Sequence, residues 1–242
     1  MERISQKDID WLLNLDKTSK ESGAAITIPK KKRRIGMRIF LGIFLIVGVV
    51  IFPFFLLIRT SVFLNLNYSL NGWISLGGGV MATIFLLLIY MYFFFRKYHN
   101  KKLLMKFSLI ASGTLVLSFC IYGLMYISSV NAKTDDIRQV YRSMHPIMRV
   151  AIATTTLADG DLVVTDIKRS PEDYAAMGLP VNESSLHFPQ ESGYVHAIDL
   201  KTKGRPEFRN FVLNASLRLM GLETIRHVGT ADHLHVALPT VH

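Results

Sequence analysis

Several residue types are scarce in this sequence or in parts of it, and each scarcity excludes a class of structure or function. Its 242 residues include one cysteine, Cys120, which excludes an intrachain disulfide and any zinc site closed by several cysteines. Three long apolar runs contain no acidic residue and no histidine, so a transporter or channel, although a possible class, lacks residues for its pathway. From Ser129 to His242 there are 12 Lys and Arg against 13 Asp and Glu. This region therefore lacks the basic face that a nucleic-acid partner requires.

The apolar runs are Ile39–Ile58, Trp73–Phe95 and Phe107–Ile127. Each is close to the roughly 20 residues that a helix needs to cross a bilayer. They account for a mean hydropathy of +0.30, which is high for a purely soluble protein. Buried helices of a soluble core are the alternative, but three uncharged runs of this length rarely occur together in such a core. We predict three transmembrane helices within residues 37–128, with a small-residue packing surface at Gly77-Gly78-Gly79.

Basic residues flank these runs unevenly. The tail, residues 1–36, ends in the run Lys30 to Arg34, and five basic residues separate the second and third runs, whereas Arg59 alone lies between the first two. Short loops rich in Lys and Arg stay in the cytoplasm. We expect a cytoplasmic N-terminus, a first span that acts as an uncleaved anchor, and an extracytoplasmic region at 129–242. The net charge of +10 then reflects topology and contact with anionic lipid rather than binding of nucleic acid.

The region 129–242 has the pattern of a small α+β domain, because its helical and strand patterns segregate instead of alternating. We predict a helix or stalk standing off the membrane at 131–143, a helix at 147–157 and a strand at 161–165. A long irregular loop follows at 170–190, and then a second strand at 194–200, an amphipathic helix at 206–221 and a hairpin formed by 223–226 and 233–237.

Potential metal ligands gather on these predicted strands. His233 and His235 lie two residues apart and share a strand face, while Asp199 follows Ala197 on another strand. Ligands of the His-Asp-His type with one position left for water are typical of catalytic zinc, whereas structural zinc usually has four protein ligands. The sequence therefore predicts a catalytic zinc site in this domain.

Four short motifs carry a resemblance to a known family. They are Ser185-Leu186-His187, Gly193, Ala197-Ile198-Asp199-Leu200 and Asp232-His233-Leu234-His235-Val236. Together they resemble the zinc D-alanyl-D-alanine carboxypeptidase family, which shares its fold with the Hedgehog signalling domain. Upstream, the segment from Val164 to Ser170 resembles the family's arginine-bearing strand and turn. The resemblance covers roughly residues 131–239, implies a Hedgehog/DD-peptidase-like domain with an antiparallel sheet, and includes none of the membrane region.

The resemblance implies roles for six residues. His187, Asp199 and His235 match the zinc ligands, Asp232 the general base, His233 a group that stabilises the intermediate, and Arg169 the group that binds a substrate carboxylate. The alternatives are that Asp232 only caps the turn before its strand and that Arg169 only pairs with a surface carboxylate.

The chain departs from the family's S-x-H-x-x-G-x-A-x-D pattern at the spacing between His187 and Asp199. The insert makes His196 a competing ligand. We favour His187 because Ser185 precedes it as the motif requires, and because His196 and Asp199 lie an odd number of positions apart and face opposite sides of a strand. The remaining histidines of this region, His145, His227 and His242, are expected to be structural or exposed.

These expectations combine into a membrane-anchored zinc peptidase that hydrolyses peptidoglycan stem peptide outside the cytoplasmic membrane. The alternative is a non-catalytic domain that binds cell wall or a partner protein on the same anchor. The bond that is cut and the oligomeric state stay open.

Overall fold

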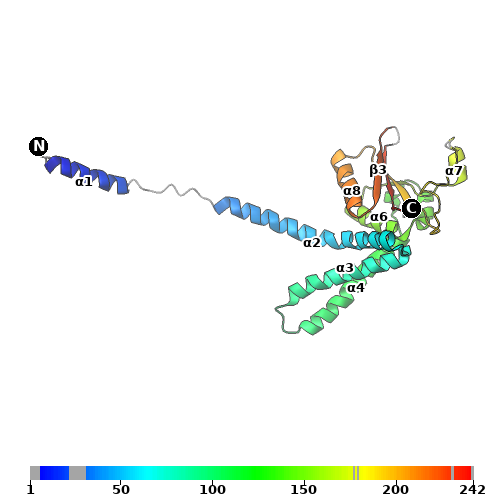
Figure 1. The fold of residues 1–242 in the computed structure, drawn as a ribbon, viewed down its shortest axis with the longest axis horizontal. Coiled ribbons are helices and arrows are strands. Elements are labelled where there is room, and N and C mark those ends of the chain that lie inside the picture. The colour runs from blue at the N-terminus through cyan, green and yellow to red at the C-terminus, as the bar shows by residue number, and fades with distance from the viewer. Residues whose placement is uncertain (1–5, 22–30, 177, 179, 230–231, 241–242) are drawn as a thin grey trace. The chain divides into compact units, whose positions relative to one another are not determined.

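The computed structural model describes residues 6–21, 31–176, 178, 180–229 and 232–240 (Figure 1). The chain divides into two compact units, Met1–Gly48 and Val49–His242. The first contains helix α1 (Gln6–Glu21) and the beginning of helix α2 (Lys31–Tyr68). The second contains the rest of α2 and all later elements, including every candidate site residue.

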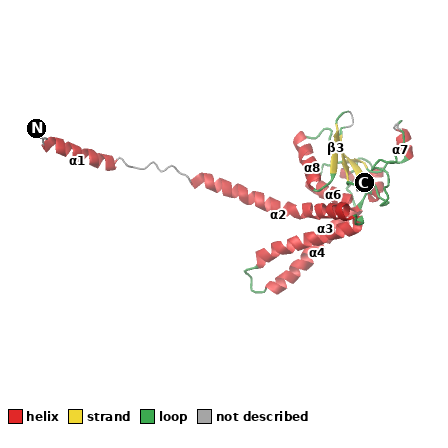
Figure 2. Ribbon diagram, in the orientation of Figure 1, coloured by secondary structure: helices red, strands yellow, loops and turns green. Residues whose placement is uncertain are grey.

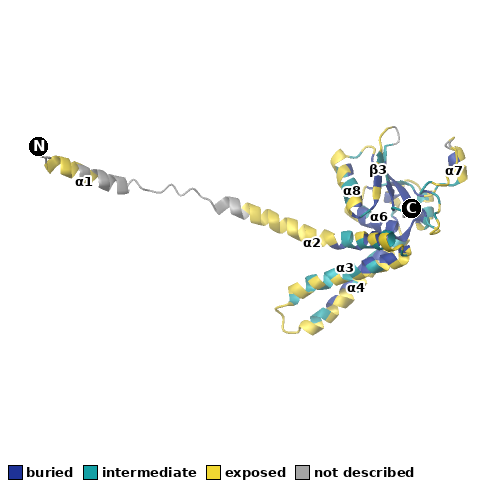
Figure 3. Cartoon of the chain, viewed as in Figure 1, coloured by how far each residue is buried: buried dark blue, intermediate teal, exposed yellow. Residues whose placement is uncertain are grey.

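Three long apolar helices, α2, α3 (Gly72–Phe95) and α4 (Lys101–Met125), match the three runs predicted to cross a membrane. Each is long and apolar enough to span a bilayer. Apolar side chains cover their outer surfaces, and large exposed residues are numerous along all three (Figure 3). Such exposure is typical of helices that face lipid, since water would not favour it.

The predicted glycine surface lies against α2. A Cβ atom on Gly79 would fall 2.2 Å from the Ser61 hydroxyl and 2.3 Å from the Leu57 carbonyl oxygen, whereas one on Gly77 would meet nothing within 4 Å. Only the absence of a side chain at Gly79 lets α3 approach α2 this closely, as is usual for small residues between membrane helices.

The C-terminal region is a small α+β domain with a four-stranded antiparallel sheet, as predicted (Figure 2). The strands follow the order β1-β2-β4-β3. Their bounds are β1 Val164–Asp166, β2 Ala197–Lys201, β3 Glu223–His227 and β4 His233–Ala237. The helices are α5 Asp135–Gln139, α6 Pro146–Ala158, α7 Pro171–Ala176 and α8 Glu207–Leu219, with short 3-10 turns at Ser129–Asn131 and Val140–Ser143.

The two faces of the sheet differ in chemistry. On β2 and β4, the residues Ile198, Leu200, Leu234 and Val236 are fully buried in a core that includes α6 and α8. Successive residues of a strand point to opposite faces, so Asp199, His233 and His235 project from the other face. The strand alternation thus separates the hydrophobic core from the candidate metal ligands.

The segment 131–143 does not stand off the membrane as a stalk. It forms two short helical elements packed on the domain, in which Tyr141 is buried and donates a hydrogen bond of 2.6 Å to the Gly123 carbonyl of α4. Arg149 of α6 donates a further bond to the carbonyl of Leu124, at 2.7 Å. Buried donors that find partners on α4 fix the domain directly to the end of this helix.

Two other expectations change in detail. The loop predicted at 170–190 contains helix α7, whose start carries Glu172 and Asp173, residues that suit the positive end of a helix dipole. The strand predicted at 161–165 begins later, at Val164, and includes Asp166.

Candidate metal centre

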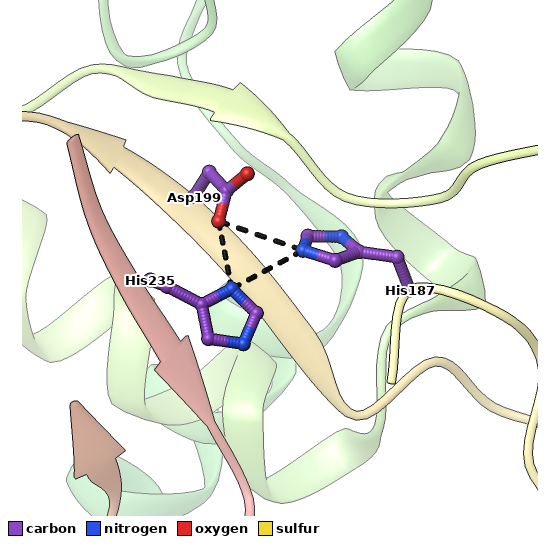
Figure 4. A group of neighbouring side chains, drawn as sticks. All are labelled: His187, Asp199 and His235. Atoms are coloured by element: carbon purple, nitrogen blue, oxygen red, sulfur yellow. Dashed lines mark hydrogen bonds and ion pairs between the residues drawn. The ribbon is translucent and has the colours of Figure 1, made fainter. Parts of the chain in front are cut away.

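Three side chains converge on the polar face of the sheet (Figure 4). Nδ1 of His235 lies 2.9 Å from Oδ1 of Asp199 and 3.3 Å from Nε2 of His187, and the His187 nitrogen lies 3.5 Å from the same carboxylate oxygen. These ligand atoms all lie within 4.8 Å of one another. The structure therefore brings together the three residues expected to bind metal, as a group that could hold one ion.

Paired strands position two members of this group. Asp199 of β2 and His235 of β4 are direct partners in the antiparallel register. Side chains opposite each other in such a pair have Cβ atoms roughly 4.5–5.5 Å apart and share a face. The sheet register alone therefore brings this carboxylate and this imidazole into contact.

His187 comes from a loop that backbone hydrogen bonds hold against the sheet. Its carbonyl accepts from the amide of Arg169 at 3.2 Å, and the carbonyl of the preceding Leu186 accepts from the amide of His196 at 2.9 Å. Ser185 assists through its hydroxyl, which accepts from the His187 amide at 3.3 Å. The Ser-x-His spacing thus shapes the turn that presents the imidazole.

A backbone carbonyl sets the tautomer of His187. Nδ1 of this ring lies 2.8 Å from the carbonyl oxygen of Ile167, which can only accept, so Nδ1 carries the proton. Nε2 is then the ring nitrogen that faces Asp199 and His235, where it can hold a proton against the carboxylate or present a lone pair to a cation. Metal-binding histidines almost always donate their second ring N–H in this way. The contact with Ile167 is therefore an independent sign that His187 is prepared as a ligand.

Asp199 is ionised in this environment. Burial alone would raise the pKa of its carboxyl group, but hydrogen bonds and charge from His187 and His235 outweigh burial and hold the pKa well below its ordinary value. Its second oxygen, Oδ2, accepts from Nη2 of Arg169 at 2.9 Å. One carboxylate oxygen thus faces the imidazoles while the other is held by a guanidinium.

The donor set suits a divalent transition metal, and zinc in particular. Two imidazole nitrogens and one carboxylate oxygen are ordinary zinc ligands, and three protein ligands leave the fourth tetrahedral position for water or substrate. His235 Nδ1 is able either to donate a proton to Asp199 or to present a lone pair to a cation. The residues present therefore fit a zinc ion without a change of ligand type.

Arg169 and His233 lie beside this group. Arg169 also donates from Nε to Asp166 at 2.6 Å, and Nε2 of His233 lies 3.8 Å from Oδ2 of Asp199. His227 is exposed, in agreement with the expectation that it is structural or exposed, and it stacks on His233 with ring centroids 4.9 Å apart. The motifs did not indicate Asp166 or the carbonyl of Ile167 as parts of the site. The position of Asp166, three residues before Arg169, is a signal for the ion pair between these two residues.

Asp232 occupies a different environment. Its carboxylate accepts from Thr202 at 2.6 Å and from the Arg226 guanidinium at 2.9 Å and 3.1 Å. These hydrogen bonds, from Arg226 first and Thr202 second, lower the pKa of Asp232 to about 2. Arg226 is itself bound to Glu207 of α8. The structure does not bring Asp232 into the group of His187, Asp199 and His235.

His196, the competing ligand, also lies outside that group. Its Nε2 is 2.7 Å from the Ser192 hydroxyl, and its ring packs against that of His145 at a centroid distance of 4.8 Å. His145 is buried, as expected for a structural histidine; burial, with the charges of His196 and Arg149, lowers its pKa to about 3. His242 lies outside the described residues.

The assignment of this site rests on its own geometry and motifs. Comparison of the chain with models of known protein families, with curated proteins and with solved structures finds no match.

Proposed function

We propose that the protein is a membrane-anchored zinc peptidase of the D-alanyl-D-alanine carboxypeptidase type, which hydrolyses peptidoglycan stem peptide. The observation that supports it most is the convergence of His187, Asp199 and His235, with ligand atoms within 4.8 Å of one another. The charge bias of the chain supports an extracytoplasmic domain, on the side of the membrane where such peptides are found.

Each residue near the group has a defined task in this proposal. His187, Asp199 and His235 would hold the zinc, and the chemistry that a zinc ion would supply there is a nucleophile, since zinc lowers the pKa of bound water to about 7. Arg169 orients Asp199 through Oδ2 and has further N–H donors for a substrate carboxylate. In this proposal His233, whose Nε2 lies 3.8 Å from Asp199, stabilises the negative charge that develops on a peptide carbonyl.

The proposed general base is Asp232, and its hydrogen bonds limit when it can accept a proton. It is bound to Arg226 and Thr202, so it can take a proton only after exchanging part of this network for contact with substrate or water. The same observation favours a second candidate function. A domain whose acidic residue stays paired with Arg226 binds metal and wall peptide, or a partner protein, without cleaving it.

Metal content and peptide cleavage, measured on one preparation, test the proposal. We expect the full chain, purified in detergent, to hold about one zinc per chain and to shorten a stem pentapeptide that ends in D-alanyl-D-alanine, as read by mass spectrometry. We expect Asp232→Ala to retain zinc and lose cleavage, whereas the surface variant Asp161→Ala retains both. Zinc without cleavage in the unmodified chain supports the binding function, and absence of zinc rejects both.

A further inference from the structure

Helix α8 is apolar on two sides. Leu213 and Leu217 are buried against the sheet. A second set of apolar residues is exposed on the other side, namely Phe208 at 75%, Phe211 at 68%, Val212 at 44% and Leu219 at 68%. Their spacing of three, four and eleven residues from Phe208 places them within one stripe along the helix. A continuous exposed stripe of this kind marks a surface that water does not cover in the working protein.

A cavity of about 450 Å³ lies beside this stripe, between α2, α6 and α8. Its apolar wall includes Ile51, Phe54 and Phe55 of α2, Leu157 of α6, and Phe208 and Val212 of α8. Small-ligand sites have volumes of roughly 300–1,000 Å³, so the space is large enough for a ligand.

Apart from Ser216, the polar side chains in the wall of this cavity are already used within the protein. The hydroxyls of Thr154 and Thr155 donate to backbone carbonyls of their own helix, at 2.9 Å each. Arg209 and Asp159 form an ion pair with each other. A polar ligand would find few free partners among these groups, so the cavity suits an apolar chain.

The position of the cavity along α2 gives its depth in a membrane. Arg59 is the first charged residue after the apolar run, and Phe55 and Ile51 precede it by four and eight positions. At 1.5 Å per residue they lie about 6 Å and 12 Å inside the apolar layer. Helices that lie in a membrane interface bury their apolar face by roughly 5–10 Å, a range that includes the depth of Phe55 and ends just short of that of Ile51.

We propose that α8 lies in the membrane interface and that the cavity between α2, α6 and α8 holds an acyl chain of a bilayer phospholipid. The wall formed by α2 continues without a break into apolar residues of the candidate span, such as Val50, which is 61% exposed, and Phe52, which is 50% exposed. A lipid chain beside this span therefore reaches the cavity without crossing a polar surface. The proposal does not depend on the metal site, which lies on the opposite face of the sheet.

Photochemical labelling from the lipid tests the cavity. The full chain is placed in nanodiscs of phosphatidylethanolamine and phosphatidylglycerol, with a diazirine at the acyl end of part of the phosphatidylethanolamine, and labelled peptides are identified by mass spectrometry. We expect label on α8 and on Ile51–Phe55, together with the exposed Leu115 face of α4, an internal control. Ser216→Phe fills the cavity and should lose the α8 label while retaining that of α4. Ser184→Phe, on an exposed loop, should lose neither.

A spin-label measurement tests the stripe separately. In a Cys120→Ala background, labels at Phe211→Cys and Ser184→Cys are compared for access to oxygen, which concentrates in lipid, and to a water-soluble nickel complex. We expect the label at position 211 to be more accessible to oxygen than to the nickel complex, and the label at position 184 to be more accessible to the nickel complex. Nickel access at both positions, or absence of α8 label when α4 is labelled, overturns the proposal. Photochemical bonds between the α8 helices of two copies, in place of lipid adducts, overturn it in favour of a dimer.

Discussion

Oδ1 of Asp199 and Nδ1 of His235 lie 2.9 Å apart on neighbouring strands in direct register. Two of the three potential ligands are thus fixed by the sheet, and only His187 depends on a loop. Sites built on strands are held more rigidly than sites built on loops. We therefore expect the metal group to be sensitive to changes in its own side chains and in the groups that hydrogen-bond to them, and insensitive to changes farther away in the domain.

Removal of a ligand is the first test of the metal site. We expect Asp199→Ala and His235→Ala to reduce zinc from about one per chain to near zero, because two ligands do not hold the ion against dilution and dialysis. Elemental analysis by mass spectrometry measures the ratio. His196→Ala is the matched control and should keep its zinc, since His196 contacts Ser192 instead of the group. Retention of zinc in both ligand variants places the metal elsewhere.

Arg169 should affect metal affinity without being a ligand. Arg169→Met removes the ion pairs with Asp166 and Asp199, at 2.6 Å and 2.9 Å, and frees the carboxylate to turn. Loss of a group that orients a metal ligand typically weakens binding roughly 10–100-fold, which competition with a chromophoric chelator measures. Arg138→Met, which loses an exposed pair with Asp135, should change nothing. Equal zinc affinity in all three proteins contradicts an orienting role.

Stability should decrease in mild acid because of His145. Its pKa is lowered from 6.5 to about 3 in the fold, so between these values the unfolded chain binds a proton that the folded chain does not. The free energy of unfolding therefore rises with pH across this interval, and the stabilising contribution of a neutral His145 is complete above pH 6.5. We expect the Tm of the full chain in detergent to fall from pH 7 to pH 4.

The variant His145→Gln isolates this contribution. We expect it to have a flatter dependence of Tm on pH, although not a level one, since burial also lowers the pKa of His196. The slope is compared and not the absolute Tm, because the ring packs against Gly72 and its replacement costs stability at every pH. An unchanged slope assigns the acid sensitivity to other groups.

The close approach of α2 and α3 gives a prediction with its own control. Gly79→Val places carbon atoms where Ser61 and the Leu57 carbonyl already lie, so the helices must separate. Overpacking of this kind costs about 1–3 kcal/mol, measurable as a lower Tm in detergent. Gly77→Val, two residues earlier and facing open space, should have little effect. Similar losses in both variants indicate a general intolerance of β-branched residues in α3.

Local patterns were sufficient to predict much of this fold. Uncharged runs predicted the three long helices, and alternation predicted that His233 and His235 share one strand face. That Asp199 lies opposite His235 depends on the pairing of β2 with β4, which the structure shows. His187 required a different signal, the Ser-x-His motif, because its position depends on a loop. The insert that follows this loop hydrogen-bonds back to it, from Gln190 to the Ser185 carbonyl and from His196 to the Leu186 carbonyl, and so the altered spacing did not prevent the convergence.

For Asp232, the family motif and the alternation of strand residues predict different positions of the side chain. Its separation of three residues from His235 is odd, so alternation alone would place the two side chains on opposite faces of the sheet. The motif indicated a shared site, whereas the structure pairs Asp232 with Arg226 and Thr202. The packing of α6 on the membrane helices had no local signal at all, because it depends on contacts between segments far apart in the sequence.

The hydrogen bonds from Tyr141 and Arg149 to the end of α4 have a further consequence. A catalytic domain on a flexible linker sweeps a volume and searches for its target. This domain is fastened to its helices, so its candidate metal ligands keep one distance and one orientation relative to them. A molecule that is to reach this group must therefore come to that distance from the helices, because the domain does not swing out to meet it.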